Sequence, residues 1–216
     1  MAGETLSSGD GGLAGDAGVA GAGGEAGAVG GGLAGAGGEA GASAEPKATD
    51  GFDASVDGWT ITGDAQASSV APDYVGVGGN PDGMISAVDD VAGGVWYFTA
   101  PEKYLGDNSA LYGMLLSFDL QVTPITTPFS SPDVELIGGG ITLAFDCSFD
   151  PGQTWTSYEV PLSEAGWKVG SLSGADATEA ELRSVLAATT SLRIRGEFNE
   201  GSDTGQLDNV AFGVPE

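Results

Sequence analysis

Residues 94–120, GVWYFTAPEKYLGDNSALYGMLLSFDL, determine the fold class of this chain. They begin with three consecutive aromatic residues, and this apolar run stops at Ala100-Pro101, as a strand does at a proline. After a polar loop, Leu116, Phe118 and Leu120 alternate with polar residues, which is the period-two pattern of a half-buried strand. The stretch therefore predicts a strand, a loop and a second strand.

Other segments predict short strands and a single helix. Residues 134–137 and 141–145 are apolar runs on either side of three glycines, a pattern typical of a hairpin. Thr178 and Glu181 form a capping box ahead of an apolar stripe at helical spacing, so we expect a helix over residues 179–188. Residues 123–132, rich in Pro, Thr and Ser, are expected to form a loop between strands.

The last strand needs an irregularity to bury its apolar residues. In LDNVAF, strict alternation cannot place both Leu207 and Val210 on the core face. A bulge at Asp208-Asn209 would allow both side chains to be buried.

Two parts of the sequence resemble one extracellular family. The segments WYFTAPEKYLGDNSALYG and LSFDL, and later LRIRGEF and LDNV, resemble the laminin B domain, also called laminin IV type A, over roughly residues 52–212. The resemblance implies a non-catalytic β-sandwich located outside the cell. With the strand patterns it predicts an all-β, jelly-roll-like antiparallel β-sandwich with one short helix, behind a disordered Gly/Ala-rich tail.

The composition divides the chain into a linker and one domain. Every Trp, Tyr and Phe lies from Phe52 onward. Before that point glycine recurs at nearly every third position, and the octet GAGGEAGA occurs twice, yet the glycine triplets contain no proline and a collagen helix is not expected. Residues 1–49 are therefore predicted to be a disordered low-complexity linker, and residues 50–216 one folded domain.

The charge excludes several classes of partner. The net charge is −25, from 31 acidic and 6 basic residues, and the chain contains no histidine. Nucleic acid and anionic membrane surfaces need clustered Lys and Arg, so neither is expected as a partner. No run is long and apolar enough for membrane insertion, and the first residues lack the pattern of an export signal.

Catalysis is not expected either. Without histidine, Ser-His-Asp and Cys-His arrangements are excluded. Paired carboxylates acting on a glycosidic bond remain an alternative, but acidic residues are too abundant here for any one pair to be informative. The only cysteine, Cys147, follows an apolar run and is expected to be a buried, unreactive thiol.

A glycan site would combine an exposed aromatic ring with polar side chains. Trp155 is expected opposite the buried face of Tyr158, Val160 and Leu162, whereas the chain's other tryptophans, Trp59, Trp96 and Trp167, are expected in the core. In SLRIRGEF, Leu192, Ile194 and Phe198 alternate with polar residues on the opposite face. The predicted ligand-binding residues are thus Trp155, Arg193, Arg195 and Glu197. The alternative for both arginines is a structural ion pair with a neighbouring carboxylate.

The resemblance to jelly-roll modules also implies a structural Ca²⁺ where the first and last strands meet. By that resemblance Asp53 and Asp208 would be its carboxylate ligands, with backbone oxygens completing the shell. The alternative is a pair of solvated acids beside a turn and a bulge.

Two functions remain after these exclusions. The first is a monomeric binding module, extracellular or on the surface of the cell envelope, that takes a glycan or another matrix-like polymer. The second is a structural spacer or a domain that binds an extracellular protein, with no small ligand. An exposed aromatic ring in a groove would favour the first.

Overall fold

The structure is a computed structural model that describes residues 45–65, 70–89 and 93–216. Most of the predicted linker lies outside these residues. The first strand, β1 (Ala48–Asp50), begins two residues before the predicted domain boundary and pairs with the last strand, Ala48 opposite Phe212. Within the described ranges, no helix is long and apolar enough to cross a membrane.

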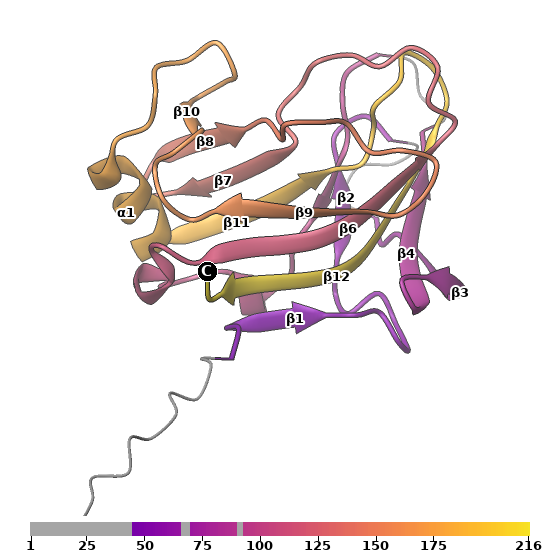
Figure 1. Ribbon diagram of the computed structural model, residues 1–216, viewed down its shortest axis with the longest axis horizontal. Coiled ribbons are helices and arrows are strands. Elements are labelled where there is room, and N and C mark those ends of the chain that lie inside the picture. The colour runs from indigo at the N-terminus through magenta and orange to yellow at the C-terminus, as the bar shows by residue number, and fades with distance from the viewer. Residues whose placement is uncertain (1–44, 66–69, 90–92) are drawn as a thin grey trace, which may run out of the picture. The chain divides into compact units, whose positions relative to one another are not determined.

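The described strands form two antiparallel sheets that face each other, as Figure 1 shows. The first, sheet A, has the order β3-β4-β12-β6-β9, with β1 also beside β12. Its strands are β3 (Asp73–Gly79), β4 (Asp82–Val88), β6 (Leu115–Thr123), β9 (Thr156–Pro161) and β12 (Thr204–Val214). The predicted β-sandwich is therefore confirmed, and β3 is an edge strand of sheet A.

Sheet B has the order β10-β8-β7-β11-β5-β2. Its strands are β2 (Thr60–Thr62), β5 (Tyr97–Thr99), β7 (Val134–Gly138), β8 (Ile141–Phe145), β10 (Lys168–Val169) and β11 (Thr189–Arg195). The 3₁₀ turns η1 (Glu102–Tyr104) and η2 (Ser109–Leu111) lie between β5 and β6. Residues 94–120 thus contain β5 of sheet B, most of β6 of sheet A and the connection between the two sheets.

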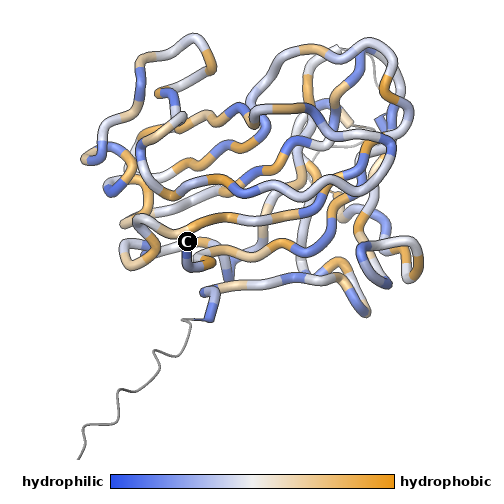
Figure 2. Tube along the Cα trace, in the orientation of Figure 1, coloured by the Kyte–Doolittle hydropathy of each residue, from blue (hydrophilic) through white to orange (hydrophobic). Residues whose placement is uncertain are grey.

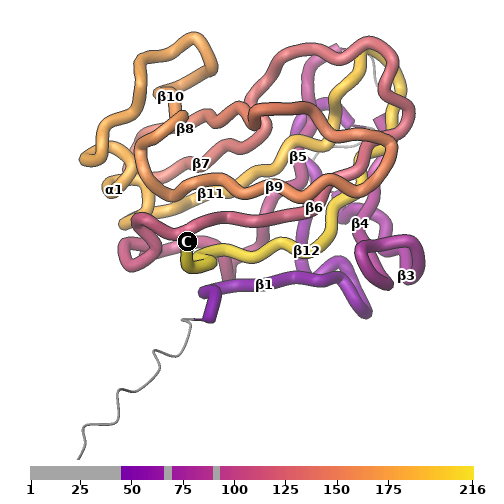
Figure 3. The backbone as a smooth tube through the Cα atoms, viewed as in Figure 1, coloured from indigo at the N-terminus to yellow at the C-terminus, as the bar shows by residue number. Residues whose placement is uncertain are grey.

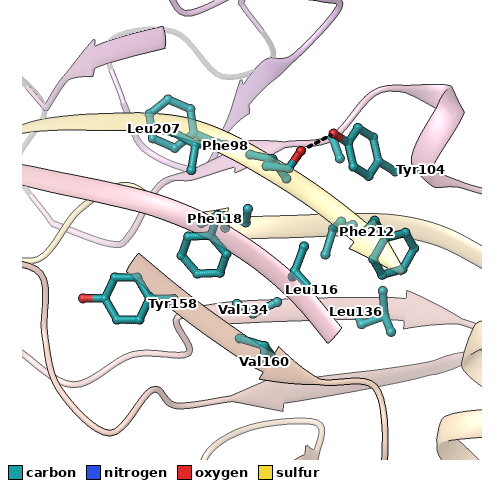
Figure 4. Close-up of a cluster of buried hydrophobic side chains, with 14 of the residues drawn as sticks. Phe98, Tyr104, Leu116, Phe118, Val134, Leu136, Tyr158, Val160, Leu207 and Phe212 are labelled. Atoms are coloured by element: carbon teal, nitrogen blue, oxygen red, sulfur yellow. Dashed lines mark hydrogen bonds between the residues drawn. The ribbon is translucent and has the colours of Figure 1, made fainter. Parts of the chain in front are cut away.

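Alternation along the strands places the core between the sheets. Leu116, Phe118 and Leu120 of β6 are all buried, and Figure 2 shows hydrophobic and hydrophilic residues alternating along the strands. Figure 4 shows Phe118 and Leu116 among side chains from other strands. Trp59, Trp96 and Trp167 are also buried, as predicted. Burial of this apolar surface is the main stabilising contribution, on the order of 25 cal/mol per Å².

The last strand contains the predicted bulge. Asp208 pairs with Asp119 and Ala211 pairs with Ser117. Between these two pairs β12 advances by three residues and β6 by two, so β12 contains one extra residue. Asn209 has a φ of 50°, in the left-handed region that asparagine tolerates better than most residues. Leu207 and Val210 are both buried as a result.

The hairpin and the helix also form where the sequence predicts them. Strands β7 and β8 join at Gly139 and Gly140, whose φ angles of 57° and 79° suit a tight two-residue turn. The helix α1 (Glu179–Ala187) ends one residue before the predicted end. Its capping box is complete: the Thr178 hydroxyl accepts from the Glu181 N–H, and Glu181 accepts from the Thr178 N–H at 2.8 Å.

Candidate functional site

The loop that joins β8 to β9 carries the chain from sheet B to sheet A (Figure 3). Beside it lies a hollow of about 460 Å³. It is lined by residues 145–149, at the end of β8 and in the loop, and by residues 157–159 of β9. A second hollow of about 300 Å³ shares residues 146–149 and extends over residues 128–130 and Asp150. Because β9 is an edge strand of sheet A, we call the two together the β9-edge pocket.

Phe149 presents an aromatic ring in this pocket. Its side chain is 54% exposed, the second-largest exposure among the exposed large hydrophobic residues of the described chain. The ring stacks on Tyr158 at a centroid distance of 5.2 Å, and Tyr158 stacks on Phe118, also at 5.2 Å. Phe149 is thus the outer member of a stack that reaches the core, and its position is fixed although it is exposed.

Tyr158 contributes a buried hydroxyl group without a protein partner. The side chain is 5% exposed, and the oxygen accepts and donates no hydrogen bond in the described residues. Figure 4 shows this oxygen pointing away from Phe118 and the other labelled core side chains. Burial is the main cause of the raised pKa of Tyr158, and the Asp133 charge adds to it, so the hydroxyl stays protonated. An unsatisfied buried hydroxyl costs about 1–3 kcal/mol, which a bound polar group would recover.

Polar residues line the same pocket as the ring. They are the exposed residues Asp146, Ser148, Asp150, Ser157 and Glu159. Burial raises the pKa of Asp146, and the neighbouring Asp150 charge raises it further. The pocket therefore offers hydrogen-bond donors and acceptors around an aromatic surface, with an excess of negative charge.

Cys147 lines the pocket and is partly buried, whereas the sequence predicts a buried thiol. Its backbone N–H donates to the Asp133 carboxylate at 2.8 Å. Burial and the adjacent Asp133 charge raise the pKa of the thiol, which suppresses the reactive thiolate. The expectation of an unreactive thiol agrees with these surroundings.

Arg195 has a structural role in this arrangement. It is 1% exposed, and its guanidinium donates to the backbone oxygens of Glu197 and Phe129 at 2.5 and 2.6 Å. It also pairs with Asp133 at 3.3 Å. The sequence places Arg195 on the outer face of its strand, but the loop of residues 124–133 covers that face, with the Phe129 ring 4.5 Å away. The guanidinium is consequently not presented to a ligand.

Arg193 and Glu197 do not join a common site with Trp155 either. Arg193 pairs with Glu135 at 3.0 Å on the outer face of sheet B, in agreement with the structural alternative. Trp155 precedes β9 of sheet A, and its indole N–H donates to the Gly78 carbonyl at 2.9 Å. Trp155 is half-buried, so its ring is only partly available.

Glu197 is buried beside other acids. It is 4% exposed and accepts a hydrogen bond from the Trp96 N–H at 3.2 Å. Burial, followed by the charges of Asp89 and Asp64, raises the pKa of Glu197 to about 7. The folded protein therefore holds this proton more tightly than the unfolded chain does.

We expect this proton to make stability depend on pH. The contribution of Glu197 to the free energy of unfolding should be greatest below about pH 4.5 and should fall as the pH rises to about 7. Between these two pH values the Glu197 carboxyl is protonated in the folded state but ionised in the unfolded chain. The expected loss is about 2–3 kcal/mol. Urea unfolding across this range should show a shallower fall for Glu197→Gln. The exposed Glu200→Gln should keep the wild-type slope, and an unchanged slope in Glu197→Gln would contradict the assignment.

The surroundings of Asp208 do not fit the predicted calcium ion. Its two carboxylate oxygens accept from the backbone N–H groups of Asn80 and Asn209 at 2.6 and 2.7 Å. The facing Asp119 accepts from the side-chain amides of the same two asparagines. Asp53 is exposed. Each Asp208 oxygen thus already accepts an amide hydrogen, and amide hydrogens directed at a carboxylate repel a cation. Across residues 45–65, 70–89 and 93–216, no three acidic or thiol side chains are placed to hold a metal ion.

A chelator tests this conclusion directly. We expect the melting temperature of the full chain to be the same, within about 1 °C, in Ca²⁺ and in EDTA. A bound calcium ion present at a hundred times its Kd would instead stabilise the folded chain by about 2.7 kcal/mol, which would raise the melting temperature visibly. Differential scanning fluorimetry is sufficient for the comparison. A rise of several degrees in Ca²⁺ that Asp208→Asn abolishes would restore the calcium site.

Sequence reasoning missed the residues of the β9-edge pocket. Tyr158 was assigned to the core face from its alternation, which is correct for its ring but gives no information about its hydroxyl. Phe149 lies between Ser148 and Asp150 in a polar loop, and a single aromatic residue in such surroundings is the signal that could have identified it.

Comparison with known sequences identifies one family. The model of Laminin B (Domain IV) matches residues 97–215. Human laminin subunit gamma-1 is 33% identical over 123 residues, which cover 54% of this chain and 7% of the relative. Laminin subunit gamma-1 of Xenopus tropicalis is 26% identical over 168 residues, or 74% of this chain and 10% of the relative. The chain thus spans a tenth or less of these laminin subunits.

Solved structures share the fold. The L4b domain of human laminin alpha-2 has a TM-score of 0.56 at 15% identity and covers 72% of this chain and 90% of that domain. The family 11 carbohydrate-binding module of Lic26A-Cel5E from Clostridium thermocellum has a TM-score of 0.52 at 15% identity, over 77% of this chain and 94% of the module. These likenesses concern the fold alone. Since the family model matches more than half of the sequence, the chain belongs to the laminin B (domain IV) family.

Proposed function

We propose that this chain is a non-catalytic extracellular module that binds a glycan in the β9-edge pocket. The observation that carries the proposal is Phe149, an exposed ring fixed by stacking in a pocket lined by hydrogen-bonding side chains. Sugars present apolar ring faces that stack on aromatic side chains, and hydroxyl groups that pair with carboxylates, serines and tyrosines. The unpartnered Tyr158 hydroxyl adds a buried group of the second kind.

The fold supports this use of the pocket. A family 11 carbohydrate-binding module from Clostridium thermocellum, solved with a β-1,3-1,4-mixed-linked tetrasaccharide, has a TM-score of 0.51 with this chain. Such a sandwich can therefore hold a glycan chain, although the likeness does not indicate which surface does so. The extracellular location, which the laminin relatives support, and a monomeric state belong to the same proposal. Calcium has no part in it.

Binding to soluble polysaccharides tests the proposal. The full chain is titrated calorimetrically with oligosaccharides of several linkages, and we expect Phe149→Ala to weaken binding by about tenfold or more, close to 1.4 kcal/mol. Val77→Ala is the matched control, because Val77 is an exposed apolar residue on β3, outside the pocket. Wild-type affinity in Phe149→Ala would contradict binding in this pocket, and no binding by the wild type would favour the structural-spacer function.

A further inference from the structure

We infer that the glycan taken by the β9-edge pocket carries free, protonated amino groups, so that its sugars are amino sugars and not acidic or fully acetylated ones. This inference rests on the proposed function and specifies its ligand class. It is carried by the charges that line the pocket and by the buried Tyr158 hydroxyl within it.

Every ionised side chain that is accessible in the pocket is negative. Asp146 lines both hollows, Glu159 lines the first and Asp150 lines the second, and all three are exposed. Asp133 lies behind them, buried and bonded to the Cys147 N–H. A ligand that enters this pocket is consequently surrounded by carboxylates on the loop side and on the β9 side.

The one basic residue of the pocket cannot balance these charges for a ligand. Arg195 is 1% exposed, and its donors are directed to Asp133 and to the backbone oxygens of Glu197, Ser131 and Phe129. A uronic acid or a sulfated sugar would therefore meet at least three exposed carboxylates without a free cation. The net charge of −25 adds a repulsion that acts at longer range.

An amino sugar uses each feature of the pocket. Its ring can stack on Phe149, and an ammonium group beside that ring gains a cation–π attraction. The same ammonium neutralises the mutual repulsion of Asp146 and Asp150. In the free protein burial is the main cause of the raised pKa of Asp146, and this repulsion adds to it. The Tyr158 side chain is 95% buried, and its hydroxyl has no hydrogen-bond partner among the described residues. This hydroxyl can pair with a neutral polar group of the sugar, an interaction that the carboxylates do not provide.

A matched pair of ligands separates charge from shape. Glucosamine hexasaccharide and N-acetylglucosamine hexasaccharide share backbone and length, and differ in whether the nitrogen is charged. The full chain is titrated with both at low ionic strength, at a pH at which the amines are protonated. We expect the free-amine form to bind about tenfold tighter or more, and this preference to decrease as salt is added.

Variants show whether the preference belongs to the pocket or to the acidic surface as a whole. The double variant Asp146→Asn with Glu159→Gln should lose the preference for the free amine, and Phe149→Ala should weaken both ligands. Glu102→Gln removes an exposed carboxylate on η1, away from the pocket, and should change neither. If the preference survives in the double variant, diffuse surface attraction explains it and the inference is wrong.

The outcomes distinguish this inference from the proposed function. Equal binding of the two hexasaccharides, or tighter binding of the acetylated one, with loss in Phe149→Ala, would overturn the amino-sugar preference and leave the glycan module intact. Absence of binding to any glycan, charged or neutral, would overturn both. Tighter binding of an acidic polysaccharide than of the glucosamine hexasaccharide would also overturn the inference.

Discussion

Replacement of Arg195 by Met is expected to lower the free energy of unfolding by about 3–5 kcal/mol, the usual cost of removing one partner from a buried charge pair. The guanidinium lies 4.1 Å from the Phe198 ring and 4.5 Å from the Phe129 ring, and it joins the loop of residues 124–133 to the end of β11. Methionine keeps part of the packing but leaves the Asp133 carboxylate without its cation and three backbone oxygens without the guanidinium donor. A loss of this size would unfold a substantial fraction of a marginally stable domain.

Arg193 is the matched control on the same strand. It pairs with Glu135 at 3.0 Å, but the side chain is one-third exposed, so Arg193→Met should cost about 1 kcal/mol or less. Urea unfolding followed by tryptophan fluorescence measures both variants. Similar losses for the two arginines, or a small loss for Arg195→Met, would show that Arg195 is not the structural centre that its contacts indicate.

Gly196→Ala is expected to destabilise the domain by about 1–3 kcal/mol or more, as overpacking of a dense core does. A Cβ added at Gly196 would lie 2.0 Å from Cζ3 of Trp96, an indole that is fully buried. Gly205 of β12 approaches the same ring, with 2.9 Å between its ideal Cβ and Cη2. The indole thus fits only because no side chain stands at these positions.

The control for this substitution is Gly152→Ala. The nearest atoms to an added Cβ at Gly152 are those of Thr154 at 3.8 Å, an ordinary van der Waals contact. Thermal unfolding should therefore show little change for Gly152→Ala and a melting temperature several degrees lower for Gly196→Ala. If Gly196→Ala folds with wild-type stability, the packing of Trp96 differs from that described.

Local patterns predicted most of the fold because they record which side chains are buried. The alternation of β6, the glycine turn between β7 and β8 and the capping box of α1 each follow from contacts over a few residues. The bulge at Asp208-Asn209 was predictable for the same reason: Leu207 and Val210 both need burial, and only an extra residue permits it.

The assignment of site residues succeeded less well because it depends on what covers a surface. Alternation correctly placed Arg195 opposite the core face of β11, but it contains no information about the loop of residues 124–133 that folds over it. Burial of Glu197 likewise depends on Trp96, which is distant in sequence and contacts it through a backbone N–H. The sequence marks Phe149 as a single aromatic residue in a polar loop without a periodic pattern, but its fixed position follows only from its stack on Tyr158 and Phe118.

The most direct test of the central claim is the location of the bound glycan. A two-dimensional ¹H–¹⁵N correlation spectrum of the full chain, recorded during titration with the tightest-binding oligosaccharide, locates the residues whose surroundings change. The β9-edge pocket predicts the largest shifts at residues 146–149 and 157–159, with saturation at the Kd found by calorimetry. Shifts confined to other surfaces, or no saturable shifts, would contradict a glycan site in this pocket.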